Sequence, residues 1–210
     1  MPPSVVHVSK HPLVLHKITL LRDETTEPKQ FRELVRELAQ LLFVEATREL
    51  PVRHLPVRTP LAECPGHQIA EVIGLVPILR AGLGMTEAIL ELAPFARVWH
   101  LGLYRDHQTL KPVTYYNKLD AGHKPDLVVV VDPMLATGGS AVVAVNLLKQ
   151  WGVKRIQFLG LIAAPEGLKV LQEAHPDVEI YLGALDSHLN EKYYIVPGLG
   201  DAGDRQFGTG

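Results

Sequence analysis

The residues best suited to chemistry follow a run of apolar residues, Leu127–Val131, and read Asp132-Pro-Met-Leu-Ala-Thr-Gly-Gly-Ser140. Helical sequence begins at Ala141. A strand that ends on an acid, passes through small residues and opens a helix brings backbone N–H groups and the positive end of a helix dipole to one point. Glycines there let the backbone approach a ligand closely. We therefore predict a phosphate site at residues 136–140, with Asp132 accepting hydrogen bonds from sugar hydroxyls.

A purely structural interpretation of this segment is a strand-to-helix turn with an N-cap, and Thr-Gly-Gly-Ser alone would favour it. The preceding acid and the four-valine strand shift the balance towards a ligand site. The sequence contains no Gly-x-x-x-x-Gly-Lys-Ser/Thr motif, which excludes the nucleoside-triphosphate P-loop.

Two arginines follow other apolar runs. Arg80 lies in Val76-Pro-Ile-Leu-Arg-Ala-Gly-Leu-Gly-Met85, and Arg105 follows Tyr104. A guanidinium suits bidentate phosphate contact, although a lone arginine is more often part of a surface ion pair. The polar segment after Arg105 does not fit the apolar alternation. A functional segment is one interpretation of it, because long irregular segments in compact domains often carry function, and a solvated loop or a subunit contact is equally compatible with it.

The glycine-rich tail, Gly198-Leu-Gly-Asp-Ala-Gly203, formally matches the dinucleotide-binding fingerprint. That fingerprint requires a following helix and an acid about twenty residues further on, and we expect neither here. Exposed backbone groups in such a loop can instead bind the edge of a planar base that alternates donors and acceptors.

These groups need a scaffold, and the apolar pattern predicts one. Short apolar runs alternate with helical stretches, which indicates an α/β fold with an open, mostly parallel sheet and helices on both faces. Ligands in such sheets bind beyond the carboxyl ends of the strands. The expected strands are 71–77, 97–103, 127–131, 156–162 and 178–182, and the expected helices are 31–50, 83–92, 138–150 and 165–174. We predict a single domain over 1–210, with a core at about 70–182 and a small hood formed by the terminal segments, including 183–210, and a loop or β-arm insertion.

Composition limits the classes of function. The chain has 210 residues, 47% of them hydrophobic, and a formal net charge of -2, so it can bury a core and has no global basic excess for nucleic acid. Its one cysteine, Cys64, favours a reducing compartment. The ten histidines form no metal-binding pair. We find no signal peptide or membrane span, and we expect a cytoplasmic protein with no nucleic-acid or membrane partner.

Three strings resemble the uracil phosphoribosyltransferases and occur in the order found in that family: Val76–Met85, Asp132–Ser140 and Tyr193–Thr209. The segment from His11 to Arg22 also resembles the N-terminus of that family. The resemblance implies transfer of the phosphoribosyl group from phosphoribosyl diphosphate (PRPP) to uracil, giving UMP and diphosphate, with Mg²⁺. It also implies a homodimer or larger homo-oligomer and control by a purine nucleotide such as GTP. For the segment from His11 to Arg22 we find no role beyond packing.

Residue patterns and resemblance together assign the site. Catalytic roles fall on Arg80, Arg105, Asp132 and Asp201. PRPP contacts fall on Arg80, Arg105, Asp132, Pro133, Met134, Leu135, Ala136, Thr137, Gly138, Gly139, Ser140 and Asp201. The resemblance implies uracil contacts at Ile195, Gly200, Asp201 and Ala202. Uracil has an edge of the kind that exposed backbone groups can bind, with two carbonyl oxygens flanking N3–H.

One departure concerns the metal. Most phosphoribosyltransferases carry two adjacent acids after the strand, whereas Pro133 takes the second place here, as in the uracil enzymes. A single carboxylate is a poor site for a hard cation. We therefore predict no protein side chain as a metal ligand and expect Mg²⁺ to be carried by the diphosphate of PRPP.

Three alternatives remain. An enzyme for another base would share the PRPP loop and need a different tail. A nucleotide-sensing regulatory protein that binds RNA could use the same fold and would be expected to show a basic face. A nicotinamide-dependent oxidoreductase is the weakest alternative.

Overall fold

The computed structural model describes residues 5–105, 112–117, 119, 122 and 124–209. Its centre is a seven-stranded sheet in which every pairing is parallel. The strand order is β1-β11-β10-β8-β4-β5, and β9 also pairs with β10. These strands are β1 (Val6–Val8), β4 (Ile73–Pro77), β5 (Arg97–Val98), β8 (Leu127–Val131), β9 (Met134–Leu135), β10 (Arg155–Ala163) and β11 (Glu179–Leu185).

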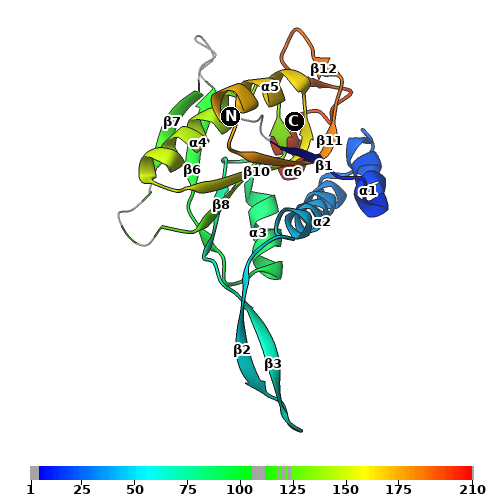
Figure 1. The fold of residues 1–210 in the computed structure, drawn as a ribbon. Helices are drawn as coiled ribbons and strands as arrows, with labels where there is room; N and C mark the ends of the chain where they lie inside the picture. Colours follow the sequence, from blue (N-terminus) through cyan, green and yellow to red (C-terminus); the bar gives the residue numbers. More distant parts are fainter. Residues whose placement is uncertain (1–4, 106–111, 118, 120–121, 123, 210) are drawn as a thin grey trace.

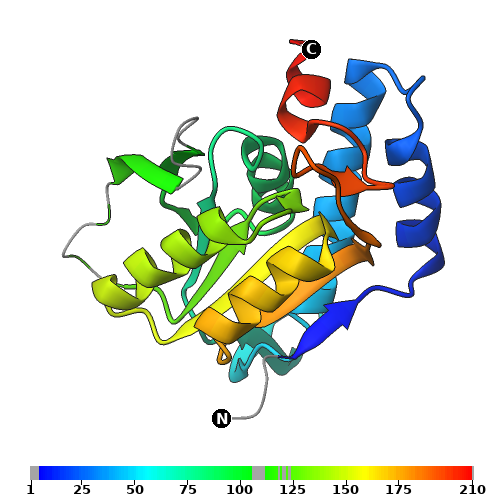
Figure 2. The same ribbon diagram turned by 90° about the horizontal axis from the view of Figure 1, so that it is seen from above.

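Helices cover both faces of the sheet, as Figures 1 and 2 show. One hydrophobic cluster joins the sheet to α1 (Pro12–Arg22), α2 (Pro28–Ala46) and α3 (Leu83–Leu92). A second cluster joins the other face to α4 (Gly139–Trp151) and α5 (Pro165–Ala174). The predicted fold class, an open parallel sheet with helices on both faces, is therefore confirmed.

The central strands form because their residues are apolar on both faces. Every residue of β4 and β8 is buried, as expected for a parallel sheet sandwiched between helices. The amphipathic spacing of α2 likewise places Phe31, Val35, Leu38 and Leu42 in the core. This helix starts at Pro28, which suits a first helical turn, and ends at Ala46, four residues before the predicted end at Leu50.

The predicted strand at residues 97–103 is wrong as a single element. β5 ends at Val98, and β6 (Leu101–Arg105) pairs outside the main sheet with β7 (Pro112–Asn117) in antiparallel register. The chain leaves the edge of the sheet after Trp99, whose N–H still donates to the Leu75 carbonyl at 3.0 Å. The polar segment after Arg105 therefore contains a strand.

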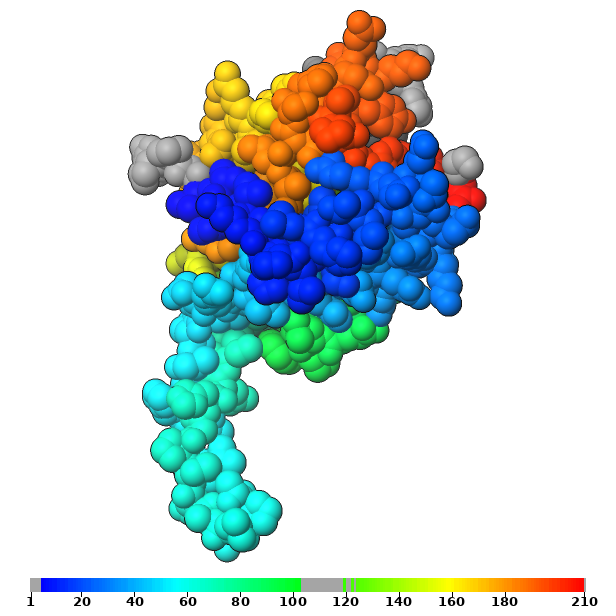
Figure 3. Space-filling view, turned by 90° about the vertical axis from the view of Figure 1, so that its right-hand side faces the viewer, coloured from blue at the N-terminus to red at the C-terminus, as the bar shows by residue number. Residues whose placement is uncertain are grey.

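A projecting hairpin was not predicted. β2 (Val52–Arg58) and β3 (Glu63–Ile69) pair antiparallel over seven residues each and extend away from the body of the molecule (Figures 1 and 3). Its apolar side chains lack a clear alternation, and Pro56 lies opposite Pro65. Val52, Val57 and Leu61 are all exposed on it.

The chain ends in α6 (Ala202–Phe207), which packs against α2, after a short ladder of β12 (His188–Leu189) and β13 (Ile195–Val196). None of the helices in the described part of the chain combines the length and apolar character that a bilayer crossing needs.

Candidate active site

The strand order reverses between β4 and β8. From β4 the chain moves to β5 on one side, and it then returns to β8 on the other side. Such a reversal opens a crevice at the carboxyl ends of the strands, where α/β proteins bind ligands. Arg80 follows β4 and Asp132 follows β8, so both predicted residues lie at this crevice.

The two loops after these strands are tied together. The Ile78 N–H donates to the Val131 carbonyl at 3.0 Å. Gly82 lies so close to the same carbonyl that a Cβ at this position would be 2.5 Å from the oxygen. The close approach leaves no room for a side chain at Gly82, and it fixes the loop that carries Arg80 against the end of β8.

Backbone hydrogen bonds also hold the predicted phosphate loop. The Pro133 carbonyl accepts from the N–H groups of Leu161 and Ile162, each at 3.1 Å. The Leu135 carbonyl accepts from the Ala164 N–H at 2.9 Å. The loop is thus fastened to β10 through the main chain, independently of its side chains.

The start of α4 distinguishes a ligand site from a simple capped turn. Gly138 is the N-cap, its φ is +79°, and no side chain caps the helix. The first N–H groups of a helix have no intrahelical acceptor, so they are available to an anion here. A Cβ at Gly138 would lie 2.6 Å from the Gly167 carbonyl oxygen, because α5 packs against this turn. The side chains of Thr137 and Ser140 are both partly exposed beside it.

Asp132 is an unusual acid. Its side chain is partly buried, and its Oδ1 accepts from the Met134 N–H at 3.3 Å. Burial raises the pKa of Asp132 to about 7, against the opposing effect of that hydrogen bond. The carboxyl group therefore changes charge near neutral pH, and its ionised form is a strong acceptor for hydroxyl groups.

The structure describes the side chain of only one of the two predicted arginines, Arg80. Arg80 is exposed after a cis peptide bond with Leu79, and no acidic side chain in the described part of the chain forms an ion pair with it. Arg105 ends β6, which begins beside the same loop because Leu79 N–H donates to the Leu101 carbonyl at 3.2 Å. The side chain of Arg105 lies outside the described part of the structure.

The predicted uracil residues divide into buried and exposed ones. Ile195 and Ala202 belong to the hydrophobic core and are only 4% and 2% exposed. Gly200, with φ +78°, and Asp201 lie at the surface. The Asp201 carboxylate caps α6 by accepting from the Asp204 N–H at 2.9 Å. Asp201 therefore has a structural role in addition to the predicted one.

Gln206 joins this tail to the Arg80 loop, and sequence reasoning missed it. The residue is 1% exposed, and its Nε2 donates to the carbonyls of Ala81 and Ala202, both at 3.1 Å. The tail and the ends of β8 and β10 lie at the same edge of the sheet in Figure 2. No local pattern marks a buried glutamine as a link of this kind, so the signal lies in the tertiary structure.

The expectation that no helix follows the glycine-rich tail is wrong, because α6 begins at Ala202. The dinucleotide fingerprint still does not fit, since it needs a parallel strand before the glycines and β13 pairs antiparallel with β12. Within the described residues, no group of three or more His, Cys, Asp or Glu side chains is placed to hold a metal ion.

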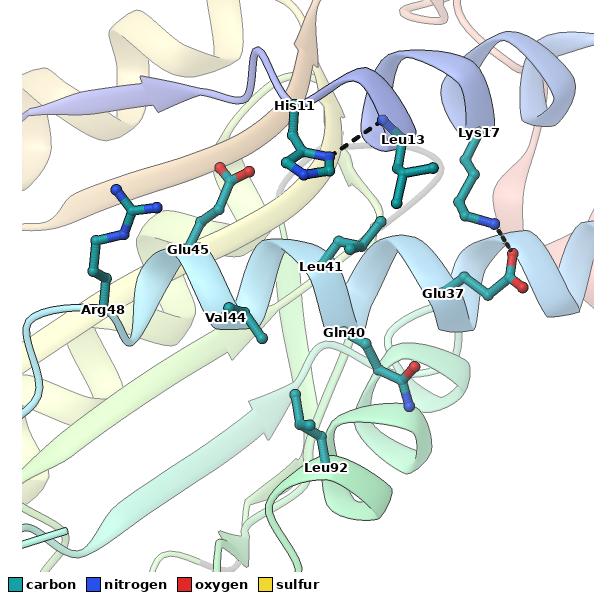
Figure 4. A pocket seen from close by; sticks show the side chains of 10 residues that line it. All are labelled: His11, Leu13, Lys17, Glu37, Gln40, Leu41, Val44, Glu45, Arg48 and Leu92. Carbon is teal, nitrogen blue, oxygen red and sulfur yellow. Dashed lines mark hydrogen bonds and ion pairs between the residues drawn. The ribbon is translucent and has the colours of Figure 1, made fainter. Parts of the chain in front are cut away.

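A hollow of about 460 Å³ lies elsewhere, between α1, α2 and the end of α3 (Figure 4). Lys17 and Glu37 form an ion pair across it, and none of the predicted site residues lines it. It is therefore separate from the crevice between β4 and β8.

Comparisons with known proteins bear on this crevice. The family model described as uracil phosphoribosyltransferase matches residues 8–209. The uracil phosphoribosyltransferase of Roseiflexus castenholzii is 69% identical over 205 residues, which are 98% of this chain and 99% of that protein. The enzyme of the same name from Halalkalibacterium halodurans is 58% identical over 207 residues, with 98% and 99% covered.

Solved structures agree with the sequence relatives. The AQ2163 protein from Aquifex aeolicus superposes with a TM-score of 0.92 at 38% identity, covering 98% of this chain and 99% of that one. A hypoxanthine phosphoribosyltransferase from Staphylococcus aureus reaches a TM-score of 0.52 at 12% identity, with 84% and 82% covered, which shows a shared fold alone. From the match of the family model over residues 8–209 and the two enzymes of that name, we conclude that the chain belongs to the uracil phosphoribosyltransferase family.

Proposed function

We propose that this chain transfers the phosphoribosyl group of PRPP to uracil, giving UMP and diphosphate, in pyrimidine salvage. The observation that best supports the chemistry is the start of α4, where a glycine N-cap in the left-handed region leaves the first N–H groups of a helix uncapped beside Asp132. Such a turn suits a phosphate group. The names of the relatives support uracil as the base.

In this proposal the 5-phosphate binds the turn at residues 136–140, and Asp132 accepts hydrogen bonds from the sugar hydroxyls. Arg80 and Arg105 stabilise the departing diphosphate by charge. The segment from Ile195 to Ala202 holds uracil, and Asp201 contacts both PRPP and the base. The neighbouring positions of the Arg80 loop and the tail, joined through Gln206, support this arrangement.

The reaction forms a bond between uracil N1 and the sugar C1 and breaks the bond between C1 and the diphosphate oxygen, which leaves with the electron pair. Anchoring both reactants removes much of the entropic cost of the bimolecular step. We identify no side chain as a general base. The N1–H of uracil is acidic enough for the tail to stabilise the developing anion, and the proton passes to solvent or to the diphosphate.

Mg²⁺ enters with the substrate in this proposal. Asp132 is one carboxyl group with a raised pKa, and Pro133 follows it, so this loop is a poor match to the several oxygen ligands that a hard cation takes. A metal carried by the diphosphate would neutralise part of its charge without a protein ligand.

We further propose that the protein is a homodimer or larger assembly. The β2–β3 hairpin supports this, because a two-stranded hairpin that projects from its domain is marginally stable by itself and this one exposes Val52, Val57 and Leu61. We expect light scattering to give at least twice the chain mass. A single-chain mass at micromolar concentration would contradict this proposal.

The proposed reaction indicates the cellular setting, and the family resemblance suggests regulation by a purine nucleotide. Its substrates are cytoplasmic metabolites, so we propose a cytoplasmic enzyme. Control by a purine nucleotide is tested by initial rates with and without GTP at low PRPP concentration.

The decisive experiment is a screen of bases with PRPP and Mg²⁺, in which nucleotide products are separated by chromatography. We expect UMP from uracil and rates at least about 100-fold lower with cytosine, orotate and hypoxanthine, because unpaired polar groups in a base site discriminate strongly. Faster turnover of another base would overturn the choice of uracil. Absence of turnover together with RNA retained at physiological salt would favour the regulatory alternative.

A further inference from the structure

A partly buried ion pair holds the C-terminal segment, residues 195–207, in place from α1. Arg22, the last residue of α1, donates to both carboxylate oxygens of Asp186, and its Nη1 lies 2.8 Å from Oδ2. The same Nη1 also donates to the Gly198 carbonyl at 2.8 Å. Asp186 in turn accepts from the Gly198 N–H, at 2.9 Å. One side-chain pair therefore fixes Gly198 through both its N–H and its carbonyl.

The hydrogen bonds to Gly198 matter because the chain turns at this residue. It lies between Ile195 and Gly200, and its φ of +65° is in the left-handed region. A Cβ there would come within 2.0 Å of the Ile195 carbonyl oxygen. The direction in which the backbone of residues 199–202 leaves this turn is set by how the Gly198 peptide groups are held.

The pair is well shielded and geometrically demanding. The Asp186 side chain is 2% exposed and that of Arg22 is 23% exposed, so solvent screens their attraction little. The planar guanidinium serves two carboxylate oxygens and a carbonyl with fixed donor directions. A lysine at this position would keep the positive charge and lose the planar set of N–H donors.

Asp186 is also anchored to the sheet. Its N–H donates to the Ala163 carbonyl at 2.8 Å, and the neighbouring Ala164 N–H donates to the Leu135 carbonyl of the phosphate loop at 2.9 Å. A short series of contacts thus runs from the phosphate loop through the ends of β10 and β11 to Asp186, Arg22 and Gly198. It sets how far the tail lies from the proposed phosphate site.

We propose that Arg22 and Asp186 are positioning residues that set the place of the pyrimidine relative to the sugar of PRPP. This inference rests on the proposed function, specifically on the tail as the base site. It gives a role to the N-terminal segment from His11 to Arg22, for which the sequence indicated only packing. Neither residue touches the reacting atoms.

Other contacts keep the tail attached when this pair is altered, which separates positioning from simple folding. Arg205 donates to the carbonyls of Leu21 and Leu199, both at 2.9 Å, and its guanidinium lies 4.4 Å from the Phe31 ring centre. Arg32 donates to the Gln206 carbonyl at 2.7 Å. A change at Arg22 therefore shifts the Gly198 turn while α6 stays docked.

The test is the Arg22→Lys variant, with initial rates measured against each substrate. We expect the KM for uracil to rise about tenfold, which corresponds to loss of one well-oriented charged hydrogen bond, while the KM for PRPP stays within about twofold. Arg155→Lys is the matched control, because Arg155 pairs with Glu71 at the opposite end of β10. We expect that variant to leave both KM values within about twofold of the unaltered protein.

A second variant separates this inference from the base site itself. Asp201→Asn keeps an N-cap for α6 and removes the charge, so it should raise the KM for uracil if the tail binds the base. A raised KM in Asp201→Asn with an unchanged KM in Arg22→Lys would overturn the positioning role and leave the base site standing. Unchanged values in both would overturn the base site and the positioning role with it.

Equal increases in both KM values with a lowered Tm in Arg22→Lys would indicate general destabilisation and would also overturn the positioning role. If Arg22→Lys gives no folded protein, Asp186→Asn replaces it, because the amide oxygen still accepts from the Gly198 N–H. The same criterion then applies: a selective rise in the KM for uracil supports the inference, and any other result overturns it.

Discussion

The phosphate loop and the C-terminal segment are positioned by different kinds of interaction. The loop after β8 is fixed by backbone hydrogen bonds in which the Pro133 and Leu135 carbonyls accept from N–H groups of β10 and of the residue after it. The C-terminal segment is held by side-chain contacts that reach distant parts of the chain. Arg22 of α1 pairs with Asp186 beside Gly198, and Gln206 of α6 donates to the Ala81 carbonyl. Anchoring by backbone hydrogen bonds tolerates many side-chain substitutions, whereas anchoring by side-chain contacts depends on a few particular residues.

This difference has a chemical counterpart. A phosphate group is the same in every PRPP-dependent reaction, and a turn built from the backbone suits it. The base is what differs between such enzymes, and a segment adjusted by a few side chains can be changed without disturbing the sheet. We therefore expect substitutions in the loop to act on PRPP and substitutions around the tail to act on uracil.

The largest expected effect comes from Gly138→Val. A side chain at φ +79° costs about 1–2 kcal/mol, and its Cβ would meet the Gly167 carbonyl at the start of α5. We expect kcat/KM for PRPP to fall at least about 1000-fold, because the turn proposed to bind the phosphate cannot keep its shape. Steady-state kinetics with PRPP varied at saturating uracil measures it.

Gly152→Val is the matched control at the other end of α4. Gly152 also has a positive φ, of +99°, and the atoms that a Cβ would meet belong to the flexible Lys124 side chain. We expect a lower Tm with kcat/KM for PRPP changed less than about threefold. A comparable loss of activity in both variants would contradict a specific role for the turn at Gly138.

Arg80→Ala is expected to reduce kcat/KM for PRPP by about 100-fold, since a charged contact to the leaving diphosphate is lost. The fold should be intact, because Arg80 is exposed. Arg97→Ala, at an exposed position on β5, is the control and should have no effect. Unchanged kinetics in Arg80→Ala would remove this residue from the site.

A smaller effect is expected from pH. The carboxyl group of Asp132, with its pKa raised to about 7, is protonated below that pH and ionised above it. The ionised form accepts hydroxyl hydrogen bonds more strongly, so the KM for PRPP should fall as pH rises from about 6 to about 8, by up to roughly tenfold.

The phosphate groups of PRPP also titrate near neutral pH and affect the KM of any variant. Comparing the pH profile with that of Asp132→Asn isolates the part that is due to Asp132. The variant resembles the neutral acid at every pH. We expect the two proteins to have similar KM values at low pH and to diverge above neutrality. Parallel profiles would show that Asp132 does not titrate in this range or does not bind the sugar.

The smallest effect concerns Gln206→Leu, which breaks the link between the tail and the Ala81 carbonyl. We expect about 1–3 kcal/mol less stability in urea unfolding and a rise of only two- to threefold in the KM for uracil, because Arg205 and Arg32 still hold α6. A larger effect on PRPP than on uracil would contradict the division between the two regions.

The sequence was informative where structure follows from local pattern. The apolar run of β8, the helix at α3 and the small-residue turn before α4 were predicted with the correct bounds or within one residue. Their residues alone determine whether they are buried, extended or helical. The position of the turn before α4 was therefore predictable, whereas its binding of a phosphate stays a prediction.

The remainder depends on contacts between distant residues. The β2–β3 hairpin has exposed strands without clear alternation, so no periodicity marked it. The ion pair between Arg22 and Asp186 joins residues 164 positions apart, and Gln206 meets Ala81 across 125 positions. No local pattern carries such information, because these partners are chosen by the tertiary fold.

The most direct test is an amide-resolved NMR titration of the ¹⁵N-labelled protein with ribose 5-phosphate and, in a separate sample, with uracil in the presence of diphosphate. We expect the phosphate to shift the amides of residues 136–140 and uracil to shift those of residues 198–202. Phosphate shifts confined to another surface, or uracil shifts that leave the C-terminal segment unchanged, would contradict the two-part site.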